Sequence, residues 1–176
     1  GTLKKNRTAK GSLLSLKAGV AVNAVPQKAV MEFSTLSEEE FKHAKDAVEK
    51  ECGVRLERSG NTVTVIGVSA HASTPHLGKN AGLAALSFAV KLPSLSAEDK
   101  EAFEAILKLF PYGVTDGSGL GIKMNDEESG DLTCTLDLFA VDDKEMRFTF
   151  DSRVPICGNK ENCEDVARKS SEAKGF

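Results

Sequence analysis

The stretch that decides the fold is Gly67-Val68-Ser69-Ala70-His71-Ala72-Ser73-Thr74-Pro75-His76-Leu77-Gly78-Lys79-Asn80-Ala81. Residues 62–66 precede it and are β-branched at every position, which predicts a strand. Residues 81–90 follow it and are rich in Ala, Leu, Phe and Val, which predicts a buried helix. Pro75 and Gly78 indicate an ordered turn. His71 is therefore expected just past a strand end, where rigid elements on both sides can present a reactive group.

An isolated histidine at a strand end is more often packed or solvated than catalytic. The pattern around His71, however, closely resembles the signature of the smaller, inserted domain of the co-catalytic zinc peptidases. This family includes aminoacylases, carnosinases, glutamate carboxypeptidases and PepV-type bacterial dipeptidases. Two other segments resemble the start and the end of that inserted domain: Gly19-x-x-x-Asn23-x-Val25-Pro26 and Asp151-Ser152-Arg153-Val154-Pro155.

Composition excludes several classes of function. The 176 residues have an ordinary globular balance, with 40% hydrophobic and 28% charged residues and a net charge of -3, so nothing indicates a nucleic-acid partner. No apolar run is long enough to span a membrane and no signal peptide is visible, so we expect a cytoplasmic protein. The cysteines lack zinc-finger spacing, and reduced thiols are expected even for Cys157 and Cys163, which are close in sequence.

The remaining patterns predict the other elements. Ser37 and Glu40 form a capping box for a helix that ends at Gly53, and Ser96 begins a helix that Pro111 stops. A final helix is expected over residues 161–173. Strands are expected at residues 13–18, 29–33, 53–57, 63–68, 120–123, 132–138 and 146–151. In the strand at 132–138, Asp137 belongs to the polar set that alternates with the buried one.

This order predicts an α+β fold, an antiparallel sheet with helices on one face, ferredoxin-like in flavour. The length indicates an enlarged domain, with either two related halves or one extended sheet. We expect a linker over residues 1–11, a lid domain over 12–155, and a C-terminal helix over 156–176 that leads back to a catalytic domain.

The resemblance implies roles for three residues. His71 would donate to the oxyanion formed in peptide hydrolysis by metal-bound hydroxide, Arg153 would hold the substrate carboxylate, and Asn23 would add a polar contact. It also implies two divalent metal ions, zinc or manganese, in the catalytic domain of a parent dipeptidase. The chain lacks the family's metal-ligand motifs, so no cofactor is expected here, and the domain alone should be inactive. The expected partners are the catalytic domain, a short peptide and, as in the classical members of the family, a second copy in a homodimer.

Other interpretations stay open. Asn23 alone would indicate a turn, and Arg153 alone a surface salt bridge. The domain as a whole could be a stand-alone ligand-binding or regulatory module, or a pure dimerisation domain that uses a strand edge or a helix face.

Overall fold

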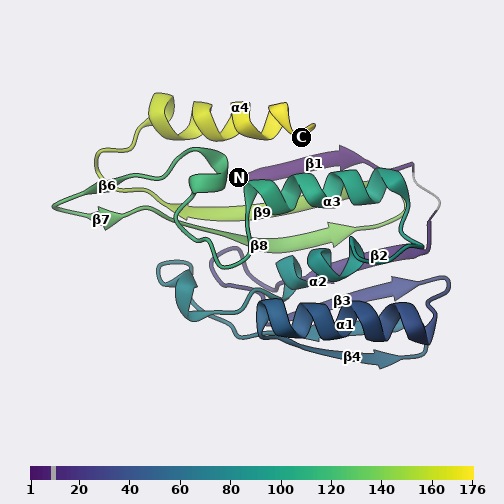
Figure 1. Cartoon of the computed structure of the whole chain (residues 1–176). Helices are drawn as coiled ribbons and strands as arrows, with labels where there is room; N and C mark the ends of the chain where they lie inside the picture. The colour runs from purple at the N-terminus through teal and green to yellow at the C-terminus, as the bar shows by residue number, and fades with distance from the viewer. Residues whose placement is uncertain (9–10) are drawn as a thin grey trace.

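The fold is built on one seven-stranded antiparallel sheet in the order β1-β9-β8-β2-β3-β5-β4 (Figure 1). A computed structural model describes residues 1–8 and 11–176. The strands are β1 (Thr2–Asn6), β2 (Leu13–Ala18), β3 (Lys28–Phe33), β4 (Arg55–Ser59), β5 (Thr62–Ile66), β8 (Thr133–Val141) and β9 (Glu145–Arg153). The predicted α+β class is confirmed. Of the two arrangements expected, the structure has the single extended sheet.

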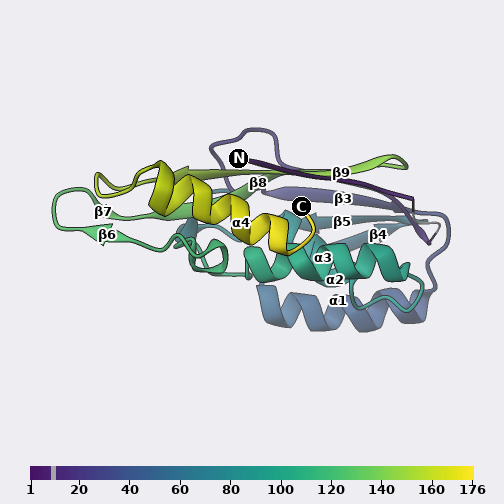
Figure 2. The same cartoon turned by 90° about the horizontal axis from the view of Figure 1, so that it is seen from above.

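The helices are α1 (Glu38–Cys52), α2 (Ala81–Ala89), α3 (Ala97–Leu109) and α4 (Asp165–Ala173), the last preceded by a π-helical turn over Lys160–Glu164. Three of them, α1, α2 and α3, lie on one face of this sheet, and α4 runs along its β1 edge (Figure 1 and Figure 2). The loop that joins β2 to β3 stands on the opposite face. The sheet therefore has a helix-covered face, which holds the core, and an open face.

Local chemistry explains the ends of α1. The Ser37 hydroxyl accepts a hydrogen bond from the Glu40 backbone N–H at 3.1 Å. At the other end Gly53 adopts a left-handed conformation with φ of 65°, and its N–H donates to the Glu49 carbonyl. Only glycine takes this conformation without a steric cost, so both predicted boundaries of the helix are set by its own residues.

Helix α2 is the centre of the core because its small residues let it approach the sheet closely. A Cβ atom at Gly82 would lie 2.2 Å from the Phe139 ring on β8, so no larger residue fits there. Phe88 packs edge-on against Phe33 and Phe41, with ring centroids 6.4 and 5.9 Å apart. This close packing fixes the position of the turn before α2, where the His71 segment lies.

The start of the chain differs from expectation. Instead of a solvated linker over residues 1–11, residues 2–6 form β1, which pairs with β9 from Thr2↔Thr149 to Asn6↔Glu145. Leu3 is buried while Lys4 is exposed, so one apolar residue on the inner face is enough to dock an edge strand that is otherwise charged. Residues 9–10 of the expected linker lie outside the described residues.

The region before β8 also differs from what the sequence predicts. The strand expected at residues 120–123 is instead a 3₁₀ turn over Ser118–Leu120 followed by irregular backbone. Gly117 and Gly121 flank that turn with φ of 75° and 76°, and two such reversals prevent an extended run. The only pairing in this region is the short hairpin of β6 (Asn125–Asp126) and β7 (Gly130–Asp131), within the residues that the structure describes.

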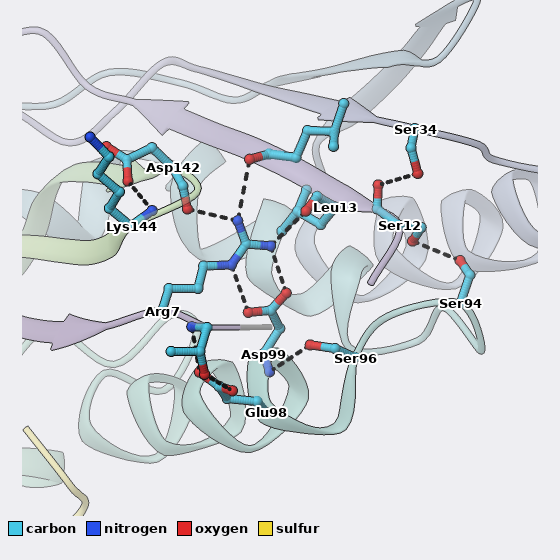
Figure 3. A network of polar contacts seen from close by, with 12 residues as sticks. Arg7, Ser12, Leu13, Ser34, Ser94, Ser96, Glu98, Asp99, Asp142 and Lys144 are labelled. Carbon is cyan, nitrogen blue, oxygen red and sulfur yellow. Dashed lines mark hydrogen bonds and ion pairs between the residues drawn. The ribbon is translucent and has the colours of Figure 1, made fainter. Parts of the chain in front are cut away.

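A buried ion pair ties four parts of the chain together (Figure 3). Arg7 follows β1 and forms a two-pronged pair with Asp99 of α3, with Nε–Oδ1 2.9 Å and Nη2–Oδ2 2.8 Å. Its other N–H groups donate to the backbone carbonyls of Leu13, Leu14 and Asp142. All five guanidinium donors are used, and Asp99 is fully buried. We call this group the Arg7 clamp.

Candidate functional site

The three residues singled out by the sequence lie at one end of the sheet, drawn at the left in Figure 1. Asn23 is in the loop after β2, His71 follows β5, and Arg153 is the last residue of β9. Because the sheet is antiparallel, β2, β5 and β9 all end at this edge. Segments far apart in sequence are thereby brought together.

Backbone contacts connect the His71 segment to the Asn23 loop. Ala24 and His71 form an isolated antiparallel bridge, and the Ala72 N–H donates to the Asn23 carbonyl at 2.9 Å. The Val25 N–H donates to the Ala70 carbonyl at 2.8 Å. These bonds hold two loops in a fixed register. The positions of Asn23 and His71 are therefore coupled.

The same segment is also attached to β8, and through β8 to Arg153. The Thr133 hydroxyl donates to the Ala72 carbonyl at 2.9 Å. Thr133 is the register partner of Arg153 in the β8–β9 ladder. Thus Asn23, Ala72, Thr133 and Arg153 form a continuous series of neighbours. Thr133 was not singled out by the sequence, because a threonine in a strand gives no signal of such a contact.

The His71 ring has a defined orientation. Its Nδ1 lies 3.0 Å from the Ser73 backbone nitrogen and 2.7 Å from the Ser73 hydroxyl. A backbone N–H can only donate, so Nδ1 accepts, and we assign the proton of the neutral ring to Nε2. The side chain is exposed, and Nε2 makes no hydrogen bond to any residue of 1–8 or 11–176. His71 can therefore donate from Nε2 to a group outside this domain.

Arg153 is held by its neighbour on the same strand. Its Nε donates to the Asp151 carboxylate at 2.9 Å, and the two side chains are 49% and 29% exposed. Its terminal amino groups make no hydrogen bonds within the described part of the chain. The pair orients the guanidinium and leaves its outer edge available for a carboxylate. Asn23 is likewise exposed.

Asp137 is a residue whose complete burial the sequence did not predict. It lies on β8 at an irregularity of the β8–β9 ladder, where the register shifts between Leu136 and Leu138. It is fully buried, and neither carboxylate oxygen has a hydrogen-bond partner among the described residues. Burial, followed by the negative charge of Asp151, raises its pKa to about 8. The alternation placed Asp137 among the polar residues of the strand, but the folded protein buries it completely.

Exposed apolar side chains gather around this end of the sheet. Of the eight large hydrophobic residues that are exposed in the described part of the chain, seven lie in its loops or just beyond them: Val20, Val22, Val68, Leu77, Val114, Val154 and Ile156. Val20 is 99% exposed. Such a concentration of apolar surface is typical of an interaction site.

The donor set for a metal centre is missing. Among residues 1–8 and 11–176, no three His, Cys, Asp or Glu side chains are grouped so that they could hold a metal ion. In the acidic turn at 126–128, the Asp126 carboxylate instead accepts hydrogen bonds from Ser129 and from the Cys157 backbone. These bonds lower the pKa of Asp126 to about 2. The two metal ions of the resembled family do not fit the donors present in residues 1–8 and 11–176.

A comparison with protein families identifies the family of this chain. The family model described as the peptidase dimerisation domain, of the M20 type, matches residues 58–154, more than half of the chain. The chain belongs to this family. A comparison with curated proteins found no match.

The matched segment defines which residues belong to the shared part of the peptidase dimerisation domain. It begins in β4 and ends directly after β9, so it includes His71, Asp137 and Arg153. Asn23 lies outside it. Within the described part of this dimerisation domain, no helix has both the length and the apolar character needed to cross a membrane.

Proposed function

We propose that this chain is the substrate-binding lid domain of a metal-dependent dipeptidase and is inactive alone. The observation that carries the proposal is the shared location of His71 and Arg153. One has a free Nε2 donor and the other has free guanidinium donors, and both lie at one exposed end of the sheet. The membership in a peptidase dimerisation family supports this assignment.

His71 would act on the reacting carbonyl. Peptide hydrolysis places a negative charge on the carbonyl oxygen in the tetrahedral transition state, and a fixed donor stabilises that charge more than it stabilises the substrate. The hydrogen bond from Ser73 to Nδ1 would fix both the tautomer and the ring orientation of His71. No reorganisation of this donor would then be needed during the reaction.

Arg153 would bind the free carboxylate of a short peptide through two parallel hydrogen bonds, with Asn23 as a further polar contact. A short substrate offers few contacts, so a strong one at its terminus matters for affinity. The metal ions would belong to a catalytic domain, because the described part of this chain has no group of donors for them. The apolar side chains around the site would face that domain and exclude water when the lid closes.

The test is His71→Ala in the intact peptidase. Loss of one oxyanion donor should lower kcat by roughly 10²–10³, with a smaller change in KM and with normal metal content. His76→Ala is the matched control, because His76 is an exposed histidine on the neighbouring 3₁₀ turn and should leave kcat nearly unchanged. A wild-type kcat for His71→Ala would remove the oxyanion role. Loss of metal in that variant would contradict the lid assignment itself.

A second function, homodimer formation, is supported by the sheet edge at β4. Within the described residues β4 pairs only with β5, so its outer edge is unpaired. Antiparallel pairing of two copies about Leu56 would place Arg55 of one copy opposite Glu57 of the other. Light scattering of Glu57→Arg should show a shift toward monomer, and the exchange Arg55→Glu/Glu57→Arg should restore the dimer. An unchanged mass for Glu57→Arg would exclude this edge.

A further inference from the structure

The buried carboxyl group of Asp137 lies next to the proposed substrate site. Asp137 is on the open face of the sheet, near Thr135 and near the Asp151–Arg153 pair of β9. The loop that joins β2 to β3 stands on this face (Figure 2), and it starts beside the backbone of Asp137: a Cβ atom on Gly19 would lie 1.9 Å from the Asp137 carbonyl oxygen, and Gly19 has φ of 86°. Only glycine allows this close approach. The loop over residues 19–24, which carries Asn23, begins at this contact.

We propose that Asp137 is a positioning residue that, while it stays protonated, leaves Arg153 free to bind the substrate carboxylate. The inference rests on the proposed function of Arg153. In the neutral state of Asp137, a single carboxylate, that of Asp151, faces the guanidinium and binds only its Nε. The remaining guanidinium donors point to no other acceptor within residues 1–8 and 11–176, and they are available to the substrate.

Ionisation of Asp137 changes this balance. A second negative charge beside Asp151 competes for the guanidinium and repels an incoming carboxylate. A buried carboxylate without hydrogen-bond donors also requires water or a cation, and we infer that either would displace the neighbouring loop over residues 19–24. Since Asn23 belongs to that loop, the same event removes both proposed substrate contacts.

The groups around Asp137 determine at which pH this happens. Burial and Asp151 raise the pKa of Asp137, whereas the Thr135 hydroxyl, the Gly1 amino group and Arg153 lower it in part. The neighbouring loop over residues 19–24 has no charged or titratable side chain. The remaining groups on the packed elements are Lys17 of β2, on the same open face, and His71 in the segment after β5.

The kinetic test compares the intact peptidase with its Asp137→Asn variant on a dipeptide between pH 7 and 9. Asparagine has the shape of the protonated acid but cannot ionise. The KM of the wild type should rise about tenfold or more over this range, the size of one charge-assisted hydrogen bond, while kcat changes less. The KM of Asp137→Asn should not show this rise between pH 7 and 9, because asparagine cannot ionise. Asp46→Asn, an exposed change on α1, should follow the wild type. Identical KM profiles for wild type and Asp137→Asn overturn the proposal.

Two further measurements separate this inference from the proposed function. Carboxyl-carbon NMR of the 176-residue chain reads the protonation of Asp137 without any catalysis, and Asp137→Asn assigns its signal. Titration near pH 8 supports the proposal, and titration in the ordinary aspartate range overturns it. Arg153→Lys in the intact peptidase should raise KM at pH 7. If it does not, the role of Arg153 is wrong, whatever the titration of Asp137 shows.

Discussion

Two fully buried aspartates, Asp99 and Asp137, have opposite surroundings. Asp99 receives two charge-assisted hydrogen bonds from Arg7 at the end of the molecule far from the site. Neither carboxylate oxygen of Asp137 has a partner among the described residues, and its backbone lies beside Gly19, where the loop that carries Asn23 begins. A buried charge is tolerated where the fold supplies a matched cation, and an unpartnered carboxyl is tolerated by remaining protonated. The first arrangement stabilises the architecture, and the second makes a region sensitive to pH.

The largest loss of stability is expected when the cation that pairs with the buried Asp99 is removed. Arg7→Ala leaves Asp99 buried without its cation and removes donors to three backbone carbonyls, so the free energy of unfolding should fall by about 3–5 kcal/mol. Urea denaturation at pH 7 measures this change. Arg147→Ala, which breaks an exposed pair with Glu145, should cost about 0–1 kcal/mol. Similar losses for the two variants would show that burial does not distinguish the two ion pairs.

Replacement of Asp137 by asparagine is expected to raise the stability by an intermediate amount. Its pKa is 3.8 in an ordinary setting and about 8 in the folded protein, so the folded state binds the extra proton between these values. Stability should therefore fall as the pH rises from about 4 to about 8 and then level off. Asp137→Asn lacks this dependence and should be more stable than the wild type by about 1–3 kcal/mol at pH 8, with little difference at pH 4. Urea midpoints at both values measure it, and a pH-independent difference would contradict the buried acid.

A smaller loss is expected at Asn80, which supports the irregular part of β8 from the helix side. Its side-chain oxygen accepts from the Leu83 N–H at 3.0 Å as the cap of α2, and its amide donates to the Leu136 carbonyl at 2.8 Å. Asn80→Ala should lower the free energy of unfolding by about 1–2 kcal/mol. Asn61→Ala, at an exposed turn with one bond to Ser34, serves as the control. Equal losses of stability in Asn80→Ala and Asn61→Ala would show that the two buried contacts of Asn80 contribute no more than the single exposed contact of Asn61.

Elements set by neighbouring residues could be predicted from the sequence. The Ser37 cap, the Gly53 stop and the β-branched run before His71 each determine their structure through contacts within a few residues. The placement of His71 after a strand follows from the same local signals. Its tautomer does not, because it depends on the Ser73 backbone orientation in the folded turn.

Features that depend on distant residues could not be predicted. Thr2–Asn6 form a strand only because β9, more than 130 residues further along, offers a free edge. Asp137 is buried at a register shift between β8 and β9, beside the start of the loop after β2. The partner of Arg7 is likewise set by tertiary structure, and a basic residue in a polar stretch gives no sign of it.

The Arg7 clamp also has a consequence for the order in which the chain folds. It joins residues near positions 7, 13, 99 and 142, and closing such long loops is entropically costly until most of the sheet exists. The α1–β4–β5 region needs only short connections and is expected to form early. Stopped-flow experiments on Arg7→Ala should therefore show a normal refolding rate and faster unfolding, because the clamp closes after the transition state.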